Sequence, residues 1–231
     1  MTIRLGLLGG TFDPIHRGHL DVAVAARDAL ALDRVLLMPA HVPPHRTQAP
    51  RASGYHRFAM VARAIAGHDR LEACDLELRV DGPSYTSVTL ARLGARGFGP
   101  TQLFFITGAD AFAEIATWHD YPALLDASHF IVISRPGHDH EHVRERLPAL
   151  ADRFVEVAPG RNNRIVAELV RPAVFLVEAT TSAVSSTEVR KRIEGGAPLD
   201  ELVPAGVLDH INRHRLYAPM TTPADVLHDE D

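Results

Sequence analysis

The chain has 231 residues, of which 46% are hydrophobic and 23% are charged, and its formal charge at pH 7 is -5. These values are ordinary for a folded globular protein and exclude a disordered or fibrous chain. The negative charge argues against general attraction to nucleic acid, so any anion site must be built locally. We expect a protein without a nucleic-acid partner.

Cysteine usage and hydropathy indicate where the protein acts. Cys74 is the only cysteine, which excludes an intrachain disulfide framework and suits a reducing compartment. No basic-then-apolar leader opens the sequence, and no apolar stretch approaches the roughly 20 residues that span a bilayer. We therefore expect a cytoplasmic protein with no membrane contact. Its length suits a single domain, expected over residues 1–217, with a flexible, acidic tail over residues 218–231.

Apolar strand-like runs alternate along the chain with helix-like stretches that are rich in Ala and Leu. Parallel neighbouring strands need crossover connections, so this alternation predicts an α/β fold, a parallel sheet with helices on both faces. The expected strands are residues 3–8, 34–38, 71–78, 102–107, 130–134, 154–157 and 174–178. The expected helices are residues 20–30, 55–66, 86–93 and 109–118.

The most informative segment is the string GGTFDPIHRGH, which ends at His19 and joins the first strand to the first helix. The first amides of a helix lack intrahelical partners and the macrodipole is positive there, which favours anionic oxygens by about 0.3–1 kcal/mol. Gly9, Gly10 and Gly18 have no Cβ and would let phosphates approach the backbone. Spaced by three, His16 and His19 project to one side and could both donate to phosphate oxygens.

Other readings of this string remain open. A Gly-Gly pair alone marks only a tight connection, and the two histidines could simply fill the helix start. Paired histidines could also bind zinc, but no third ligand stands at a recognisable spacing nearby. A Walker-type P-loop is excluded because its Gly-Lys-Ser/Thr ending is absent. The complete string favours a nucleotide-phosphate site.

Further polar segments follow the later strands, at the sheet edge where such folds bind ligands. Pro39–Arg46 follows the second strand, and Gly108–Asp110 and Arg135–Gly137 follow later ones. The Asp110 carboxylate could accept hydrogen bonds from a ribose hydroxyl, or cap its own helix, or do both. These strand ends are expected to converge on one cleft.

Two more segments could bind phosphate. Pro43 and Pro44 stiffen the loop that delivers His45 and Arg46, which suits the phosphate of an acceptor nucleotide, with Arg57 on the next helix assisting; an ordinary surface loop is the alternative. Ser185, Ser186 and Thr187 precede a helix-like run with Arg190 one turn in. This is a second candidate anion site, although an ordinary helix cap explains the same residues.

The tract His138–His142 alternates histidine with acidic residues and resembles a metal-binding run. It matches no structural metal site, however, and charged runs of this kind are typical of solvated surface. We therefore expect a solvated helix start here, and no protein-held metal.

Taken together, these motifs resemble the nucleotidyltransferase superfamily that is marked by a His-x-Gly-His helix start, and more narrowly the bacterial nicotinate-nucleotide adenylyltransferases. The resemblance covers nearly the whole chain. It implies a Rossmann-like, doubly wound parallel sheet with a small C-terminal helical portion. It also implies adenylyl transfer from ATP to nicotinate mononucleotide, giving nicotinate adenine dinucleotide and pyrophosphate, with Mg²⁺ carried by ATP. Whether the protein forms a homo-oligomer stays open.

The resemblance assigns a role to each matching residue. His16, His19 and Arg190 are the expected catalytic residues, with Arg190 as a clamp on pyrophosphate. The expected ATP-binding residues are Gly9, Gly10, Thr11, Phe12, Gly18, Gly108, Asp110, Arg135, Ser185, Ser186 and Thr187. The expected acceptor-binding residues are His45, Arg46, Arg57, Thr86, Trp118 and His119.

One position departs from the family pattern. The family usually has an acidic residue two positions after the Thr of Ser-Tyr-Thr, and this chain has Val88. An apolar side chain cannot make the hydrogen bonds by which a carboxylate would position Thr86. The preference for the nicotinate over the nicotinamide mononucleotide is therefore less firmly implied. The alternatives are a related enzyme that uses nicotinamide mononucleotide or another phosphate acceptor, and an inactive nucleotide-binding regulator.

Overall fold

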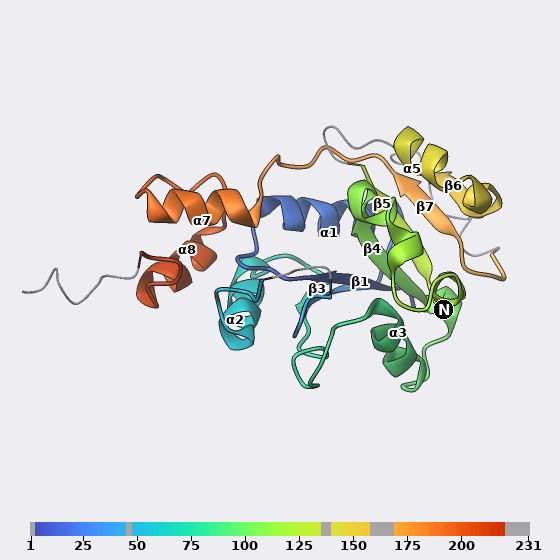
Figure 1. The fold of residues 1–231 in the computed structure, drawn as a ribbon, viewed down its shortest axis with the longest axis horizontal. Helices are drawn as coiled ribbons and strands as arrows, with labels where there is room; N and C mark the ends of the chain where they lie inside the picture. The colour runs from blue at the N-terminus through green and yellow to red at the C-terminus, as the bar shows by residue number, and fades with distance from the viewer. Residues whose placement is uncertain (1–2, 45–47, 135–139, 158–168, 220–231) are drawn as a thin grey trace, which may run out of the picture.

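One parallel sheet with helices on both faces forms the centre of the protein (Figure 1). The computed structural model describes residues 3–44, 48–134, 140–157 and 169–219. The strands are β1 (Leu5–Gly10), β2 (Arg34–Pro39), β3 (Leu71–Ala73), β4 (Leu103–Gly108), β5 (His129–Ile133), β6 (Phe154–Val157) and β7 (Val174–Val177). The α-helices are α1 (Arg17–Ala29), α2 (Gly54–Ala64), α3 (Thr86–Gly94), α4 (Ala109–Phe112), α5 (His140–Arg146), α7 (Ser186–Glu194) and α8 (Ala205–Arg213). Short 3₁₀ helices span Pro100–Gln102, Ile115–Thr117, Ala123–Asp126 and Pro148–Arg153.

The strand order places a topological switch at the middle of the sheet. The order is β3-β2-β1-β4-β5-β7-β6, and every pairing is parallel. The chain runs outward from β1 through β2 and β3, returns to β4 beside β1, and then fills the other half. This is the expected doubly wound arrangement, and ligands in such sheets bind beyond the strand ends at the switch, here between β1 and β4.

Apolar side chains on both faces of the strands build two cores, as the continuous apolar runs predict. Leu8 and Val35 pack in one core with residues of α1, α2, α7 and α8. Leu7, with Phe105 and Phe130, packs in the other with residues of α3, α4 and α5. The elements that carry the candidate site residues are therefore fixed to a common, buried sheet.

The expected bounds are wrong at three places. Gly9 and Gly10 do not form a turn: they pair with Met38 and Pro39 as the last residues of β1, and the turn follows at Phe12, whose φ is 50°. The expected strand 71–78 stops at Ala73, because the chain next turns and buries Leu76 in the core below α3. Cys74 therefore lies just beyond the strand, half-buried.

The third difference concerns the expected helix 109–118. Only α4 is α-helical, and a 3₁₀ turn over Ile115–Thr117 follows it. Phe112 and Ile115 are three residues apart and both fully buried, a spacing that a 3₁₀ turn places on one side. Trp118 then adopts an extended backbone, which carries its side chain out of the helical path.

The expected C-terminal helical portion consists of α7 and α8, which lie at one end of the molecule beside α2 (Figure 1). Tyr217 follows α8 and is 8% exposed, packed into the same core as α1 and α2. The expected domain over residues 1–217 and the expected flexibility of residues 218–231 stay predictions.

A buried histidine at the start of β5 predicts a pH-dependent stability. His129 is fully buried, its Nδ1 accepts a hydrogen bond of 3.0 Å from the Ala173 amide, and burial lowers its pKa from 6.5 to about 4. As the pH falls below about 6.5, the unfolded chain gains this proton before the folded chain does, so the free energy of unfolding should decrease. The loss is complete near pH 4 and amounts to roughly 3 kcal/mol.

The variant His129→Asn keeps an acceptor for the Ala173 amide and cannot be protonated. Urea unfolding of both proteins at about pH 7.5 and pH 4.5 measures the difference. The variant should lose less stability on acidification than the unaltered protein. An identical loss in both proteins contradicts the prediction.

Candidate functional site

Two cavities lie at the switch between β1 and β4, where the sequence predicts a cleft. The first has a volume of about 360 Å³ and the second about 490 Å³. Asp110, at the start of α4, lines both of them, so the two cavities adjoin. The first is lined by the ends of β1 and β4 and the start of α3, and the second by the start of α1 and the segment before α7.

His16 and His19 lie between the two cavities. His16 is the N-cap of α1 and lines the second cavity, whereas His19 lines the first. Their rings stack with centroids 3.7 Å apart, and the His16 amide donates to His19 Nδ1 over 3.3 Å. An Nδ1 that accepts a hydrogen bond leaves the proton of a neutral imidazole on Nε2, so His19 Nε2 is a donor. The pair places nitrogen atoms beside both cavities.

Phe12 supports this pair and does not itself line either cavity. Its side chain is 1% exposed, and its ring meets the edge of His19 with centroids 5.0 Å apart. A Cβ on Gly10 would lie 3.0 Å from the Phe12 ring, so glycine is needed there for packing. The Phe12 side chain thus contacts the histidine, and the expected contact of Phe12 with ATP stays a prediction.

The expected glycines and Thr11 are divided between the linings of the two cavities. Gly9, Gly10 and Thr11 line the first together with Gly108, and Gly18 lines the second. A Cβ on Gly18 would lie 2.9 Å from the Ser182 carbonyl oxygen. The packing of the segment before α7 therefore requires glycine at position 18, and the expected approach of phosphate to Gly18 stays a prediction.

The start of α7 is joined to the loop before α1. Ser185 caps α7 by accepting a hydrogen bond of 3.1 Å from the Glu188 amide, and it lines the second cavity. Ser186 Oγ donates to the Pro14 carbonyl over 2.8 Å. The two predicted anion-binding helix starts, residues 16–19 and 185–187, are therefore on the same side of the molecule.

The arginines of α7 take different positions. Arg190 donates to the Asp13 carbonyl over 2.6 Å and to Thr187 Oγ1 over 3.2 Å, and neither Arg190 nor Thr187 is among the residues that line the two cavities. Arg192, which the sequence analysis did not single out, lines the second cavity and donates to Glu188 over 2.8 Å. In this structure Arg190 holds the loop before α1.

Asp13 is the centre of that loop's support, a role that no local sequence pattern predicted. It is 4% exposed, and its Oδ1 accepts hydrogen bonds from the Ala52 amide at 3.0 Å and the Tyr217 hydroxyl at 2.8 Å. Its Oδ2 accepts from the Arg51 amide at 2.8 Å and lies 3.9 Å from Arg190. Burial, together with the Asp13 charge and this hydrogen bond, raises the pKa of Tyr217, so the hydroxyl remains a donor.

Arg57 takes part in the support of this loop. Its side chain is buried, with 2% of the residue exposed, and it donates to the Thr11 carbonyl over 2.8 Å and the Ala52 carbonyl over 3.2 Å. Burial lowers the pKa of Arg57, and the nearby Asp13 charge opposes this change. The guanidinium thus fixes the backbone at Thr11, and its expected assistance in acceptor binding stays a prediction.

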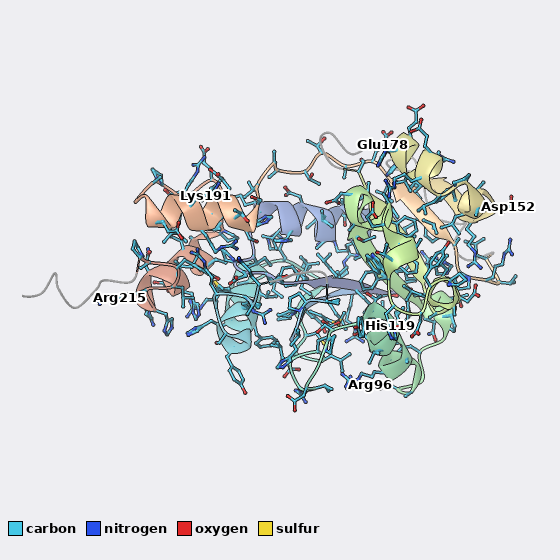
Figure 2. All side chains as sticks on the ribbon, viewed as in Figure 1. Arg96, His119, Asp152, Glu178, Lys191 and Arg215 are labelled. Atoms are coloured by element: carbon cyan, nitrogen blue, oxygen red, sulfur yellow. The ribbon has the colours of Figure 1, made fainter. Side chains whose placement is uncertain are left out.

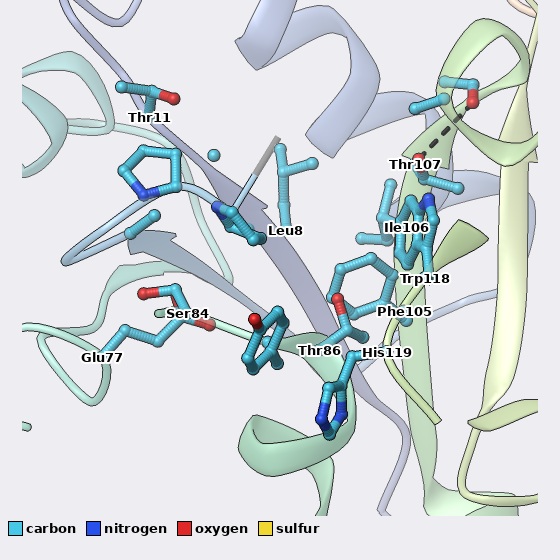
Figure 3. A pocket seen from close by; sticks show the side chains of 18 of the residues that line it. Leu8, Thr11, Glu77, Ser84, Thr86, Phe105, Ile106, Thr107, Trp118 and His119 are labelled. Atoms are coloured by element: carbon cyan, nitrogen blue, oxygen red, sulfur yellow. Dashed lines mark hydrogen bonds between the residues drawn. The ribbon is translucent and has the colours of Figure 1, made fainter. Parts of the chain in front are cut away.

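Thr86, Trp118 and His119 lie together at one end of the first cavity, next to Phe105 (Figure 3). Trp118 meets Phe105 edge-on, with ring centroids 5.8 Å apart. The His119 ring stacks on Tyr85 at 4.3 Å and lies 3.0 Å from Asp120 Oδ2. This end of the cavity thus combines aromatic surface with hydrogen-bonding groups.

Two features of the α3 start complete this end of the cavity. Thr86 is the first residue of α3. The N-cap residue, Tyr85, makes no side-chain hydrogen bond to the first amides of this helix. Val88, the departure from the family pattern, is on the same helix, 41% exposed, and does not line either cavity. The α3 start therefore offers main-chain donors but no carboxylate at position 88.

A buried carboxylate in the first cavity escaped the sequence analysis. Glu77 is 7% exposed, accepts a hydrogen bond of 2.7 Å from Thr89 Oγ1, and lies beside Ser84 in Figure 3. Burial raises the pKa of Glu77, against the opposing hydrogen bonds. The apolar neighbours of Glu77 led to its assignment within a strand, so no local signal placed it at the cavity.

Some expected residues lie outside the part of the chain that the structure describes. These are His45, Arg46 and Arg135, together with His138 and Asp139 of the histidine-rich tract. The rest of that tract begins α5, and the expectation of a solvated helix start is wrong for His140, which is 8% exposed with Nε2 3.2 Å from the Val132 carbonyl. His142 is exposed. Within the described residues, no helix is long and apolar enough to cross a membrane.

Comparison with known proteins gives the same family at the levels of sequence and fold. Residues 7–192 match the family model described as cytidylyltransferase-like. A protein of Desulfatibacillum aliphaticivorans named "Probable nicotinate-nucleotide adenylyltransferase" is 40% identical over 227 residues, covering 93% of this chain and 100% of that protein. One of the same name from Pseudomonas aeruginosa strain UCBPP-PA14 is 41% identical, covering 93% of this chain and 97% of the relative.

A solved structure shares the fold at low sequence identity. The nicotinic acid mononucleotide adenylyltransferase of Plasmodium falciparum, complexed with NaAD, superposes with a TM-score of 0.67 at 17% identity, covering 93% of this chain and 97% of the other. This likeness supports the Rossmann-like architecture described above. The chain therefore belongs to the cytidylyltransferase-like family and, within it, to the nicotinate-nucleotide adenylyltransferases.

Proposed function

We propose that the protein transfers the adenylyl group of ATP to nicotinate mononucleotide, forming nicotinate adenine dinucleotide and releasing pyrophosphate. The observation that carries the proposal is the stacked pair His16 and His19, which separates two adjoining cavities at the sheet switch. Two nucleotides that must react need two adjoining pockets with cationic or hydrogen-bonding groups at the boundary. The names of the curated relatives support the same reaction.

The chemistry needs alignment more than proton transfer. A phosphate oxygen of the mononucleotide attacks the α-phosphorus of ATP, and the bond from that phosphorus to the bridging oxygen of the β-phosphate breaks. The attacking oxygen is already ionised at neutral pH, so no general base is needed. Catalysis then comes from positioning the two phosphates and stabilising the charge on the reacting oxygens. His19 Nε2, a donor beside the first cavity, is placed to serve the α-phosphate.

The second cavity suits the triphosphate. His16 lies at the start of α1 and Ser185 at the start of α7, and both line this cavity. Two helix starts that face one space supply a positive potential for phosphate oxygens. Asp110, which lines both cavities, would bind the ribose, and Gly108, which lines the first cavity beside it, would contact the adenosine side of ATP. Arg135 stays a proposed ATP ligand.

Arg190 keeps a proposed role as the pyrophosphate clamp. A guanidinium has five N–H donors, and its bonds to Asp13 and Thr187 use two of them. Departing pyrophosphate at the start of α7 would meet the remaining donors after a modest rotation of the side chain. Ser186 and Thr187 would contribute main-chain donors at the same helix start.

The first cavity suits the pyridine mononucleotide. Trp118, held edge-on by Phe105, offers a face on which a pyridine ring can stack. Thr86 and the first amides of α3 would receive the nicotinate carboxylate, because a helix start without a side-chain cap favours an anion. The main chain at His119 would contribute there, and His45 and Arg46 would bind the phosphate of the mononucleotide.

Mg²⁺ is proposed to enter with ATP. This ion takes phosphate oxygens and keeps several waters, so it needs few ligands from the protein. Asp110 lines both cavities and Glu188 lines the second, and both side chains are exposed. When bound, the ion neutralises charge on the phosphates, while the protein's own groups hold and align them.

A cytoplasmic site of action is proposed as well. A single cysteine, Cys74, cannot form an intrachain disulfide, and this suits a reducing compartment.

Pyrophosphate release with ATP and Mg²⁺ tests the acceptor. Nicotinate mononucleotide should be used about 10–100-fold more efficiently, in kcat/KM, than the nicotinamide form, because a charged group at the α3 start gains about 1.5–3 kcal/mol in hydrogen bonding. Equal turnover of both acceptors would favour the relaxed alternative that Val88 suggests. Turnover of neither, with ATP binding intact, would favour a nucleotide-binding regulator.

A further inference from the structure

Three histidines come together outside the two cavities, between α2 and α8. His56 is in the first turn of α2, while His210 and His214 lie at the end of α8. One ring nitrogen from each lies within 4.8 Å of the others. His210 is 5% exposed, His56 is half-buried and His214 is exposed, so the group has a buried base and an opening to solvent. It is at the end of the molecule where Arg215 lies (Figure 2).

The nitrogen geometry resembles that of a zinc site. His56 Nδ1 and His210 Nε2 are 3.1 Å apart. Tetrahedral zinc with Zn–N bonds of 2.0–2.1 Å holds neighbouring ligand nitrogens roughly 3.3 Å apart, so the separation of these two already suits zinc, and the ion would replace the hydrogen bond between the rings. The His214 ring lies 4.4 Å from the His210 ring and 4.9 Å from the His56 ring, measured between centroids. Because His214 is exposed, its side chain is able to rotate toward a bound ion.

The position of the ligands in the sequence also favours a metal. His210 and His214 are four residues apart and share one face of a helix, the spacing by which helices present paired histidine ligands. His56 comes from another helix, 154 positions before His210. Arg63 and Asp209, the charged neighbours of the group, pair with each other over 3.3 Å. Their charges therefore largely cancel beside an incoming cation.

We infer that His56, His210 and His214 form a binding site for a divalent transition-metal ion of the Zn²⁺ class, with water as the fourth ligand. Three imidazoles without a carboxylate select Zn²⁺, Co²⁺, Ni²⁺ or Cu²⁺, and disfavour Mg²⁺ and Ca²⁺, which prefer oxygen.

The site would act as a clamp on the loop before α1. His56 precedes Arg57, which holds the Thr11 carbonyl, and His214 is three residues before Tyr217, which holds Asp13. An ion that joins α2 to α8 would fix both supports of that loop at once. This inference does not depend on the adenylyl transfer, because ion binding is measured without nucleotides.

Tag-free protein, stripped with a chelator, is titrated with Zn²⁺ against a chromophoric chelator and with Co²⁺ in a visible absorption experiment. We expect one tightly bound Zn²⁺ per chain, the d–d absorption of a low-coordinate Co²⁺ site, and a rise in Tm on adding Zn²⁺. His214→Gln should weaken Zn²⁺ binding by about 100-fold and abolish the Co²⁺ spectrum. Because His214 is exposed, the metal-free Tm of this variant should not change.

Two controls separate this site from other histidines. His68→Gln removes an exposed histidine on the loop after α2 and should leave Zn²⁺ binding unchanged. The double variant His138→Gln/His142→Gln should also leave it unchanged. The inference is overturned if the stripped protein binds no Zn²⁺ at micromolar concentrations, if His214→Gln and His56→Gln bind it as before, or if binding follows the 138–142 tract.

Discussion

Replacing His19 by alanine is expected to lower kcat for pyrophosphate release by about 10²–10³-fold, the cost of losing one donor to a developing charge. His19 donates from Nε2 beside the first cavity, while its Nδ1 is held by the His16 amide. Contacts with ATP elsewhere stay in place, so the dissociation constant for ATP should change by less than about tenfold. Steady-state pyrophosphate release and isothermal titration with ATP measure the two quantities.

The conservative variant His19→Gln tests whether the donor is the cause. A glutamine amide can place an N–H near the position of Nε2, so this variant should recover part of the lost turnover. His68→Ala, a change at an exposed histidine outside both cavities, should have no effect. If His19→Ala weakens ATP binding and turnover equally, the histidine serves binding alone and the regulator hypothesis gains support.

Local sequence patterns predicted the parts of this fold that depend on local physics. Apolar runs predicted the inner strands, because a strand buried on both faces must be apolar along its length, and the edge strands β3 and β6 were found although each carries an exposed glutamate. The alternation of strands and helices predicted a parallel sheet but not the order of its strands. The doubly wound order was predicted from the family resemblance. His16, His19 and Ser185 were found because helix starts carry recognisable residue patterns.

The supports of the site could not be predicted, because they depend on contacts between distant residues. Asp13 meets Tyr217, 204 positions later, and Arg57 reaches back 46 positions to the Thr11 carbonyl. An arginine at the start of a helix looks the same in the sequence whether it faces solvent or the interior. Glu77 was missed for the same reason, since only the approach of Thr89 explains its burial.

These supports explain why the loop before α1 can hold its shape. Residues 11–16 connect β1 to α1 and include Phe12, a non-glycine residue with a φ of 50°. Such a conformation is costly unless neighbours hold it. Asp13 is bonded to the segment before α2 and to Tyr217, and the Asp13 carbonyl to α7. Three distant parts of the chain thus meet at one carboxylate beneath the histidines.

Asp13→Ala is therefore expected to lower the free energy of unfolding by about 3–5 kcal/mol, as for loss of one partner in a buried charged network. It would leave the Ala52 and Arg51 amides and the Tyr217 hydroxyl without their acceptor, and Arg57 without its nearby negative charge. Tm should fall by on the order of 10 °C for a chain of this size. Urea unfolding and a thermal scan measure both effects.

Two further variants test whether the expected loss of stability comes from the hydrogen bonds around Asp13. Tyr217→Phe removes a single hydrogen bond to Asp13 and should cost only about 1 kcal/mol. Asp152→Ala, at an exposed aspartate far from the cavities, should change stability by less than about 0.5 kcal/mol. If Asp13→Ala is no more destabilising than Tyr217→Phe, the carboxylate is not the centre of this support. The loop shape, and with it the placement of His16 and His19, would then have to depend on Arg57 and Arg190 acting through the main chain.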